Sequence, residues 1–337
     1  MFSAFKKYTW FLKMALFAAG LAAFAASIRF AGLNRLGEVL PAVSGKGLFL
    51  LLIYLFTFFW DVIGWQVLFA GPTARRVNFL ELYFIRLAGE AVNNITPFID
   101  VAGEFLKAAL LTERFGISKK SAAVSVIMAR TSLFFSEIVF WVAGFVAAFF
   151  MLAMPKSSKW SLVITILAFL VVSGWVFLTQ KRGFFSTLFG ALRRIGLKPQ
   201  FIEKFHISFQ EADREITSFY GEHRARMASS VFLHAVGWAA GTLEVYAMLR
   251  LIGVPVTWGE AFLLESMLQL VKTASFFIPG NLGAQEAGLA LLCQWMGYEP
   301  SAGIALSLYK RFRQLVWTAA GFGVWGLYVI IKRYGKK

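Results

Sequence analysis

Residues 277–286 of this chain read FIPGNLGAQE, and they interrupt an apolar stretch that runs from about residue 257 to residue 296. Proline removes a backbone donor and glycine frees φ, so a continuous helix is not expected to pass through this segment. A second apolar stretch, residues 79–115, is interrupted at NNITP, residues 93–97. Each stretch is therefore expected to form two short helical arms joined by a break, which falls at Pro279, Gly280 and Gly283 in one and at Pro97 in the other.

The composition around these breaks is that of a membrane protein. Apolar residues make up 58% of the 337 residues and charged residues 15%, against about 25% charged in an ordinary soluble chain. A crossing helix needs ~20 mostly apolar residues. By that measure we expect an all-α polytopic membrane protein, one membrane domain over residues 1–337, with six full crossings at about 10–30 (an uncleaved anchor), 47–70, 121–153, 158–179, 228–251 and 303–331.

The two interrupted stretches are interpreted as re-entrant hairpins, which enter and leave the membrane on the same side. Non-helical backbone survives at membrane depth only where protein or water surrounds it. With this arrangement, twenty-one Lys and Arg residues fall in inside segments and five in outside segments. Because cytoplasmic loops collect Lys and Arg, we expect both termini in the cytoplasm, in a bacterial inner membrane. The longest inside segment, 180–226, is expected to be an amphipathic connector at the interface.

An ordered set of residues recurs in both halves of the chain. Seven residues after each proline stands a glutamate, Glu104 or Glu286, and fourteen residues after a following glycine stands an arginine, Arg130 or Arg311. The matches continue upstream, where Glu90 corresponds to Lys272 and Asp61 to Glu244. We interpret the chain as a duplicated helix–hairpin–helix unit, residues 47–153 and 228–331.

One additional crossing between the units would give the second unit the opposite orientation in the membrane. Inverted repeats whose broken helices meet near the midplane are the architecture of alternating-access transporters. Charged groups inside a membrane usually face a cavity or a partner. We therefore predict a substrate path that contains Glu104, Arg130, Glu286, Arg311, Lys107, Glu90 and Lys272, with Asp61 and Glu244 as proton sites. The alternative is that these groups are ion pairs that hold helices together.

Several other functions are poorly supported. The net charge of +16 would suggest nucleic acid in a soluble chain, but the inside loops account for it, and we expect no nucleic-acid partner. A single cysteine, Cys293, and three scattered histidines offer no metal site, and no Walker A sequence is present. We expect no cofactor.

The second break also carries a family resemblance. Residues 279–286, PGNLGAQE, resemble the Pro-Gly-x-x-Gly-x-x-Glu hallmark of the lysylphosphatidylglycerol-synthase transmembrane-region family of flippase-like proteins. Residues 103–107, GEFLK, resemble the Gly-Glu-x-x-Arg/Lys element of its first half, and Arg130 and Tyr309-Lys310-Arg311 resemble its paired arginine positions. The similarity covers essentially the whole chain, and the stand-alone form also resembles members associated with hopanoid biosynthesis loci.

The chain departs from the family pattern at two places. Ala129 stands where members often carry an acidic residue, and the first break lacks the glycines of the second. Larger members add an aminoacyl-transferase domain after the membrane region, whereas this sequence ends at Lys337, so lysyl transfer is not expected. The resemblance implies a translocase, not an enzyme, for a lipid or lipid-linked intermediate whose anionic headgroup Arg130 and Arg311 would neutralise. The alternatives are a membrane-embedded transferase that uses a lipid-linked substrate and an ion-coupled small-solute transporter. The sequence neither indicates nor excludes a homo-oligomer.

Overall fold

The computed structural model describes residues 47–96, 102–152, 155–183, 186–187, 200–275 and 278–334. These residues form helices and connecting turns, with no strand among them. In chain order the helices are α3 (Gly47–Gln66), α4 (Gly71–Arg76), α5 (Phe79–Ile95), α6 (Ala102–Phe115), α7 (Lys119–Met151), α8 (Lys156–Arg182), α10 (Gln200–Glu222), α11 (Arg224–Leu251), α12 (Trp258–Ala274), a 3-10 turn (Pro279–Asn281), α13 (Ala284–Trp295) and α14 (Pro300–Tyr334).

Five helices in the described part of the chain are long and apolar enough to cross a membrane, namely α3, α7, α8, α11 and α14. They match five of the six predicted crossings, with ends that differ by a few residues. The first predicted crossing, residues 10–30, lies outside the described residues. The predicted connector contains α10, which is 23 residues long.

The two interrupted stretches each form a helical hairpin. Their arms, α5 with α6 and α12 with α13, contain 12 to 17 residues, short of the ~20 that a crossing takes. The first break begins at Thr96, and Pro97 lies outside the described residues. In the second break Gly280, Asn281 and Gly283 have φ of 61°, 51° and 79°. Such values suit glycine because it has no Cβ, which explains why this break is rich in it.

Polar caps set where the first arm of each hairpin begins. The side chain of Asn78 accepts hydrogen bonds from the backbone N–H groups of Leu80 and Glu81 at the start of α5. Thr257 and Glu260 form a reciprocal capping box at the start of α12. Both caps satisfy N–H groups that a helix terminus leaves without partners.

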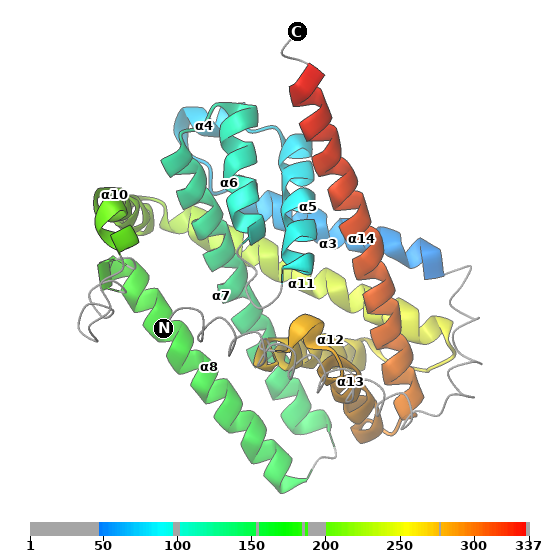
Figure 1. Ribbon diagram of the computed structural model, residues 1–337. Helices are drawn as coiled ribbons and strands as arrows, with labels where there is room; N and C mark the ends of the chain where they lie inside the picture. Colours follow the sequence, from blue (N-terminus) through cyan, green and yellow to red (C-terminus); the bar gives the residue numbers. More distant parts are fainter. Residues whose placement is uncertain are drawn as a thin grey trace, which may run out of the picture.

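The hairpins are the centres of two hydrophobic cores. One core surrounds α5 and α6 and includes Leu82, Ile85 and Leu111, and the other surrounds α12 and α13 and includes Leu264, Leu268 and Leu289. Each hairpin also packs against a long helix of the other half: α5 lies along α14, and α12 lies against α7 (Figure 1). The helices α3 and α11 make the most extensive helix–helix contact. The helix α11 also packs against α7, so four helix pairs join the two halves in the described part of the chain.

Candidate functional site

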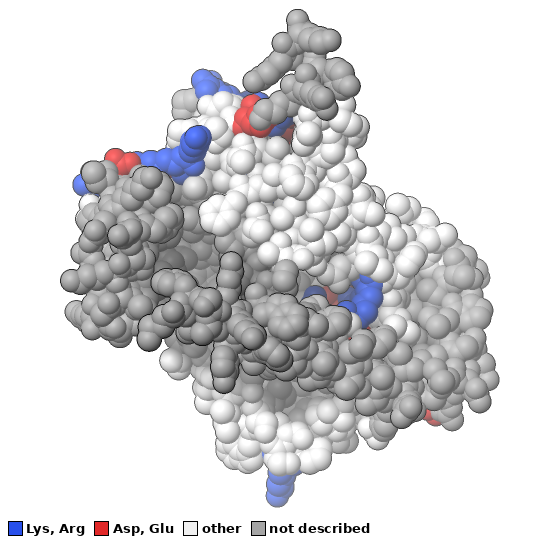
Figure 2. Space-filling view, viewed as in Figure 1, with Lys and Arg blue, Asp and Glu red and all other residues white. Residues whose placement is uncertain are grey.

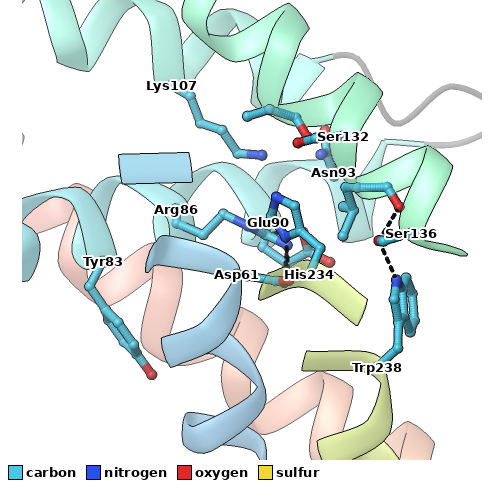
Figure 3. A network of polar contacts seen from close by, with 12 residues as sticks. Asp61, Tyr83, Arg86, Glu90, Asn93, Lys107, Ser132, Ser136, His234 and Trp238 are labelled. Atoms are coloured by element: carbon cyan, nitrogen blue, oxygen red, sulfur yellow. Dashed lines mark hydrogen bonds and ion pairs between the residues drawn. The ribbon is translucent and has the colours of Figure 1, made fainter. Parts of the chain in front are cut away.

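Charged residues from five helices meet beside the first hairpin, and Figure 3 shows Asp61, Arg86, Glu90, Lys107 and His234 of this group. We call this group the first cluster. It contains Asp61 from α3, Arg86 and Glu90 from α5, Glu104 and Lys107 from α6, Arg130 from α7 and His234 from α11. Most of these side chains are largely buried, so each charge requires a partner.

Arg86 connects two carboxylates of the first cluster. Its Nη2 lies 3.1 Å from Asp61 Oδ2 and its Nη1 2.6 Å from Glu90 Oε2. Arg86 and Glu90 are spaced i,i+4, so they lie on one face of α5. Asp61 Oδ1 lies 3.0 Å from Nδ1 of His234, so the carboxylate of Asp61 is shared between a helix of each half.

Glu104 is held at the start of α6 by two donors. Lys107 Nζ lies 2.8 Å and Asn93 Nδ2 3.2 Å from Glu104 Oε1. Asn93 also accepts a hydrogen bond from the N–H of Gly103 at 2.7 Å. A Cβ at residue 103 would lie 2.0 Å from the carbonyl oxygen of Gly89, which explains why a glycine precedes Glu104.

A small cavity lies at the centre of the first cluster. It has a volume of about 20 Å³ and is lined by Asp61, Trp65, Arg86, Glu104, Lys107, Val126, Ala129, Arg130, Leu133 and His234. One water molecule needs ~10–15 Å³, so the cavity can hold one. Glu104 and Arg130, which the repeat had singled out, both line it. The residue Arg130 is exposed on its other side.

Sequence reasoning missed His234 as a member of this site. In the sequence, the three histidines were considered only as possible metal ligands. The available signal was that His234 falls inside the predicted crossing 228–251, where a titratable side chain is a functional candidate by default. Its partner, Asp61, is in the other half of the chain and could not be assigned from spacing.

The second half has its own ionic network, which we call the second cluster, made of Glu244, Glu265, Gln269, Lys310 and Arg313. Lys310 Nζ lies 2.7 Å from Glu265 Oε2 and 3.3 Å from Glu244 Oε2. Arg313 pairs with Glu244 and lies 4.0 Å above the ring of Tyr54. Gln269 Nε2 donates to Glu265 at 2.9 Å. Both Asp61 and Glu244, which we predicted as proton sites, thus have basic partners.

A third group, the break clamp, consists of Glu286, Ser307 and Arg311. Arg311 Nε and Nη2 lie 2.5 and 3.0 Å from the two carboxylate oxygens of Glu286, which is 0% exposed. Ser307 donates to Glu286 at 2.8 Å, and so does the N–H of Gly283. Arg311 also donates to the carbonyl oxygens of Gly280 and Asn281 at 3.1 and 3.3 Å. The predicted pair Glu286–Arg311 therefore satisfies backbone groups that the break leaves open.

Lys272 lies close to the second break, at the end of α12. Its side chain is half-buried and forms no hydrogen bond or ion pair within the part of the chain that the structure describes. Its counterpart Glu90 is paired with Arg86 instead, so the equivalent positions have different environments. Figure 2 shows a group of blue and red atoms beside α14, within an otherwise white area of this face.

No group of three or more His, Cys, Asp or Glu residues that could hold a metal is found among the described residues. The ionisable groups of the site instead alternate in sign and are mostly paired. Such an arrangement can bind a small charged or zwitterionic group by exchanging partners.

Comparisons with known proteins place these observations in a family. The sequence model of the family described as "Lysylphosphatidylglycerol synthase TM region" matches residues 10–321. A "UPF0104 membrane protein" of Methanothermobacter thermautotrophicus is 23% identical over 267 residues, which cover 72% of this chain and 73% of that protein. No solved structure matches the chain. The family match spans both hairpins and all five long helices up to residue 321 of α14, and the chain therefore belongs to the lysylphosphatidylglycerol synthase transmembrane-region family of multi-pass membrane proteins.

Proposed function

We propose that this protein is a flippase-like translocase that moves a lipid or lipid-linked intermediate with an anionic headgroup across the membrane. The observation that carries the proposal is the cavity of the first cluster. Ionisable groups at membrane depth are costly and mark a substrate or ion pathway more often than a structural role. Here six of them, from five helices, surround a space that is large enough for water.

The headgroup would bind first at Arg130. This residue lines the cavity on one side and is exposed on the other, so it connects the surface with the interior. An arginine offers a planar set of N–H donors that suits phosphate or carboxylate oxygens. Lys107 lies on the same cavity and would be the next donor that a moving headgroup meets.

A matching pair of cations lies at the second break. Lys272 forms no side-chain hydrogen bond or ion pair with the described residues, although Glu265 and Glu137 act on its charge. The side chain of Arg311 is 20% exposed although it binds Glu286. We place these two residues at the other end of the path. The acyl chains would remain in the bilayer, against the apolar outer faces of α7 and α14 such as Val139, Phe150 and Leu315.

Alternating access would come from movement of one half against the other. We propose six crossings, with the hairpins re-entrant from opposite sides as an inverted repeat. Two features support this. The hairpin arms are shorter than the five long helices, and the packing is reciprocal, since α5 lies along α14 and α12 along α7. We further propose an inner-membrane location with both termini in the cytoplasm.

The test uses the purified full chain in vesicles of phosphatidylcholine that contain fluorescent NBD-labelled phosphatidylglycerol. Dithionite added outside bleaches only the outer leaflet, so its effect reports the sidedness of the label. Wild-type protein should increase the bleached fraction with time, and Arg130→Gln should reduce that rate strongly. NBD-labelled phosphatidylcholine is the neutral comparison. Because of the resemblance to hopanoid-locus members, a labelled hopanoid is the third cargo to compare.

Arg250→Gln is the matched control, because Arg250 is exposed at the end of α11 and outside all three groups. It should leave the rate unchanged. If Arg130→Gln and Arg250→Gln behave alike, the path does not run past Arg130. Mass spectrometry of the same lipids separates the functions: a change in sidedness without a new product supports a translocase, whereas a new lipid product supports a transferase.

A further inference from the structure

His234 is a buried titratable group whose two ring nitrogens have different surroundings. The residue is 3% exposed, and Nδ1 lies 3.0 Å from Asp61 Oδ1. The other oxygen of Asp61 accepts from Arg86, which favours the ionised carboxylate. An ionised carboxylate can only accept, so Nδ1 must carry the hydrogen of this bond. The neutral ring then has a bare lone pair on Nε2.

Nε2 of His234 is buried and has no hydrogen-bond partner among the residues that the structure describes. A buried acceptor without a partner lowers the stability of the folded protein, so such an atom in a native structure requires an explanation. His234 is part of the wall of the 20 Å³ cavity, which can hold one water molecule as a partner. A proton on Nε2 would convert the same atom into a donor.

Among the described residues of the first cluster, the charges balance only while the ring of His234 is neutral. Asp61 comes from α3, Arg86 and Glu90 from α5, Glu104 and Lys107 from α6, and Arg130 from α7. These are three carboxylates and three cations. A proton on His234 therefore leaves the first cluster with one excess positive charge. In a poorly solvated site that charge requires an anion.

We propose that His234 binds the proton that is coupled to headgroup transport, and that this proton and an anionic headgroup at Arg130 occupy the first cluster together. The inference rests on the proposed translocase function and adds its coupling ion. The proton comes from water on one side, adds to the lone pair of Nε2 without breaking another bond, and leaves from the same atom on the other side. Because the two ligands offset each other's charge, each strengthens the binding of the other by the same factor.

Because of the position of His234, binding of a proton there can affect how the two halves pack against each other. Its helix, α11, contacts α3 of the other half along its length. A Cβ at residue 64 would lie 2.9 Å from the imidazole ring, so the ring rests directly on the backbone of α3. One turn earlier on α11, Ser230 donates to the carbonyl oxygen of Gly64 at 2.7 Å. A change of charge at His234 therefore acts at the contact between the two halves.

His234→Asn tests the proposal with little change in shape. The amide N–H of asparagine can still donate to Asp61 from near the position of Nδ1, but asparagine cannot take up a proton. In the vesicle assay, wild-type transport of NBD-phosphatidylglycerol should be several-fold faster at about pH 6 than at about pH 8, because the lower pH favours the protonated ring. The rate of His234→Asn should be independent of pH. Transport of NBD-phosphatidylcholine should show little pH dependence in either protein.

Two control variants separate the proton from local structure. His223→Asn removes a histidine outside the first cluster and should retain the wild-type pH profile. Ser230→Ala removes the bond to Gly64 and should lower stability while the pH profile stays. If His234→Asn keeps the wild-type profile, His234 is not the proton site, although the translocase function would stand.

Nitrogen-15 NMR of the ring tests proton binding without transport. In lipid nanodiscs that contain phosphatidylglycerol, the signal lost in His234→Asn should change to that of a cationic ring between about pH 8 and pH 5. A ring that stays neutral at pH 5 would overturn the proposal. If the ring is protonated but wild-type protein moves no labelled lipid at any pH, the proton site stands and the translocase function falls.

Discussion

The two halves of the molecule bury their charges in different ways. In the second cluster, the side chains of Glu244, Lys310 and Glu265 are between 2 and 5% exposed. In the first cluster, those of Asp61, Arg86 and Glu104 are between 11 and 15% exposed and surround a cavity. The buried charges thus form a closed ionic network in the second half and a network beside a water-sized cavity in the first, and of these residues only Asp61 and Glu244 are matched to each other by the repeat.

If the two halves are repeats of one unit, as we propose, this difference teaches that two repeats need not form equal sites. A closed network of paired charges holds its helices in one arrangement, because separating them would leave a buried charge unpaired. A network beside a water-sized cavity can exchange partners at lower cost. We therefore assign the structural role mainly to the second half and the moving role to the first. Four predictions test that assignment.

The largest effect is expected at Lys310. Lys310→Met leaves Glu265 and one side of Glu244 without their cation, and the loss of one partner of a buried pair costs ~3–5 kcal/mol. Thermal unfolding in detergent should show a clearly lower Tm. Lys107→Met is the matched change in the first cluster and should cost less, because Glu104 borders the cavity and keeps Asn93 as a donor. Equal losses in Tm would mean that the clusters do not differ in rigidity.

The two repeated arginines should separate stability from transport. Arg311→Gln removes the bidentate partner of Glu286 and two donors to the break, and hydrogen bonds to a charged group contribute ~1.5–3 kcal/mol each. We expect a loss of about 2–3 kcal/mol, because Ser307 and Gly283 still donate to Glu286. Arg130→Gln should change Tm much less but reduce transport more. The opposite order, measured on the same preparations, would reverse the roles that we give to the two breaks.

Replacing a glycine of the hairpins by alanine should lower stability by an amount that depends on the atoms around it. Gly103→Ala places a Cβ against the backbone of Gly89, and overpacking of this kind costs ~1–3 kcal/mol. A Cβ added at Gly280 has no atom within 4 Å. Gly280→Ala therefore loses only the stability that a positive φ costs a residue with a side chain, ~1–2 kcal/mol at most. Gly103→Ala should thus lower Tm more. A larger effect at Gly280 would mean that the second break, not the first hairpin, has the tighter packing.

The smallest effects are expected at the helix caps. Asn78→Ala and Thr257→Ala each remove an N-cap, which typically contributes ~1 kcal/mol. Thr257→Ala should cost slightly more, because the hydroxyl of Thr257 also donates to the carboxylate of Glu260. Differential scanning fluorimetry in detergent can compare the two variants. If Asn78→Ala lowers Tm more than Thr257→Ala does, the cap of the first hairpin contributes more stability than the cap of the second.

Local features of the chain could be predicted from sequence. The five described crossings follow from hydropathy, the two breaks follow from proline and glycine chemistry, and the pair Arg86–Glu90 follows from helical spacing. The pair Glu286–Arg311 was found because both residues recur in the repeat. Each of these inferences depends on residues that are neighbours on one helix or on a pattern that occurs twice.

Contacts between the halves could not be predicted. His234 and Asp61 are 173 positions apart, and no periodicity connects them. Asn94, in the predicted first break, binds Thr318 and Gln314 of α14 at 2.9 and 3.0 Å, although nothing in the repeat relates these residues. Such contacts depend on how the two units dock, which is decided by packing across helices and not by local sequence.

The reciprocal packing of the hairpins also has a consequence for biosynthesis. The first hairpin is translated long before α14, against which α5 lies. During synthesis, Asn94 therefore lacks its partners until residues 314–318 have left the ribosome and entered the membrane. The ion pairs of Arg86 and Lys107 can form earlier, because their partners lie within the first half. The native arrangement of either half is thus completed only when the last helix of the chain is in place.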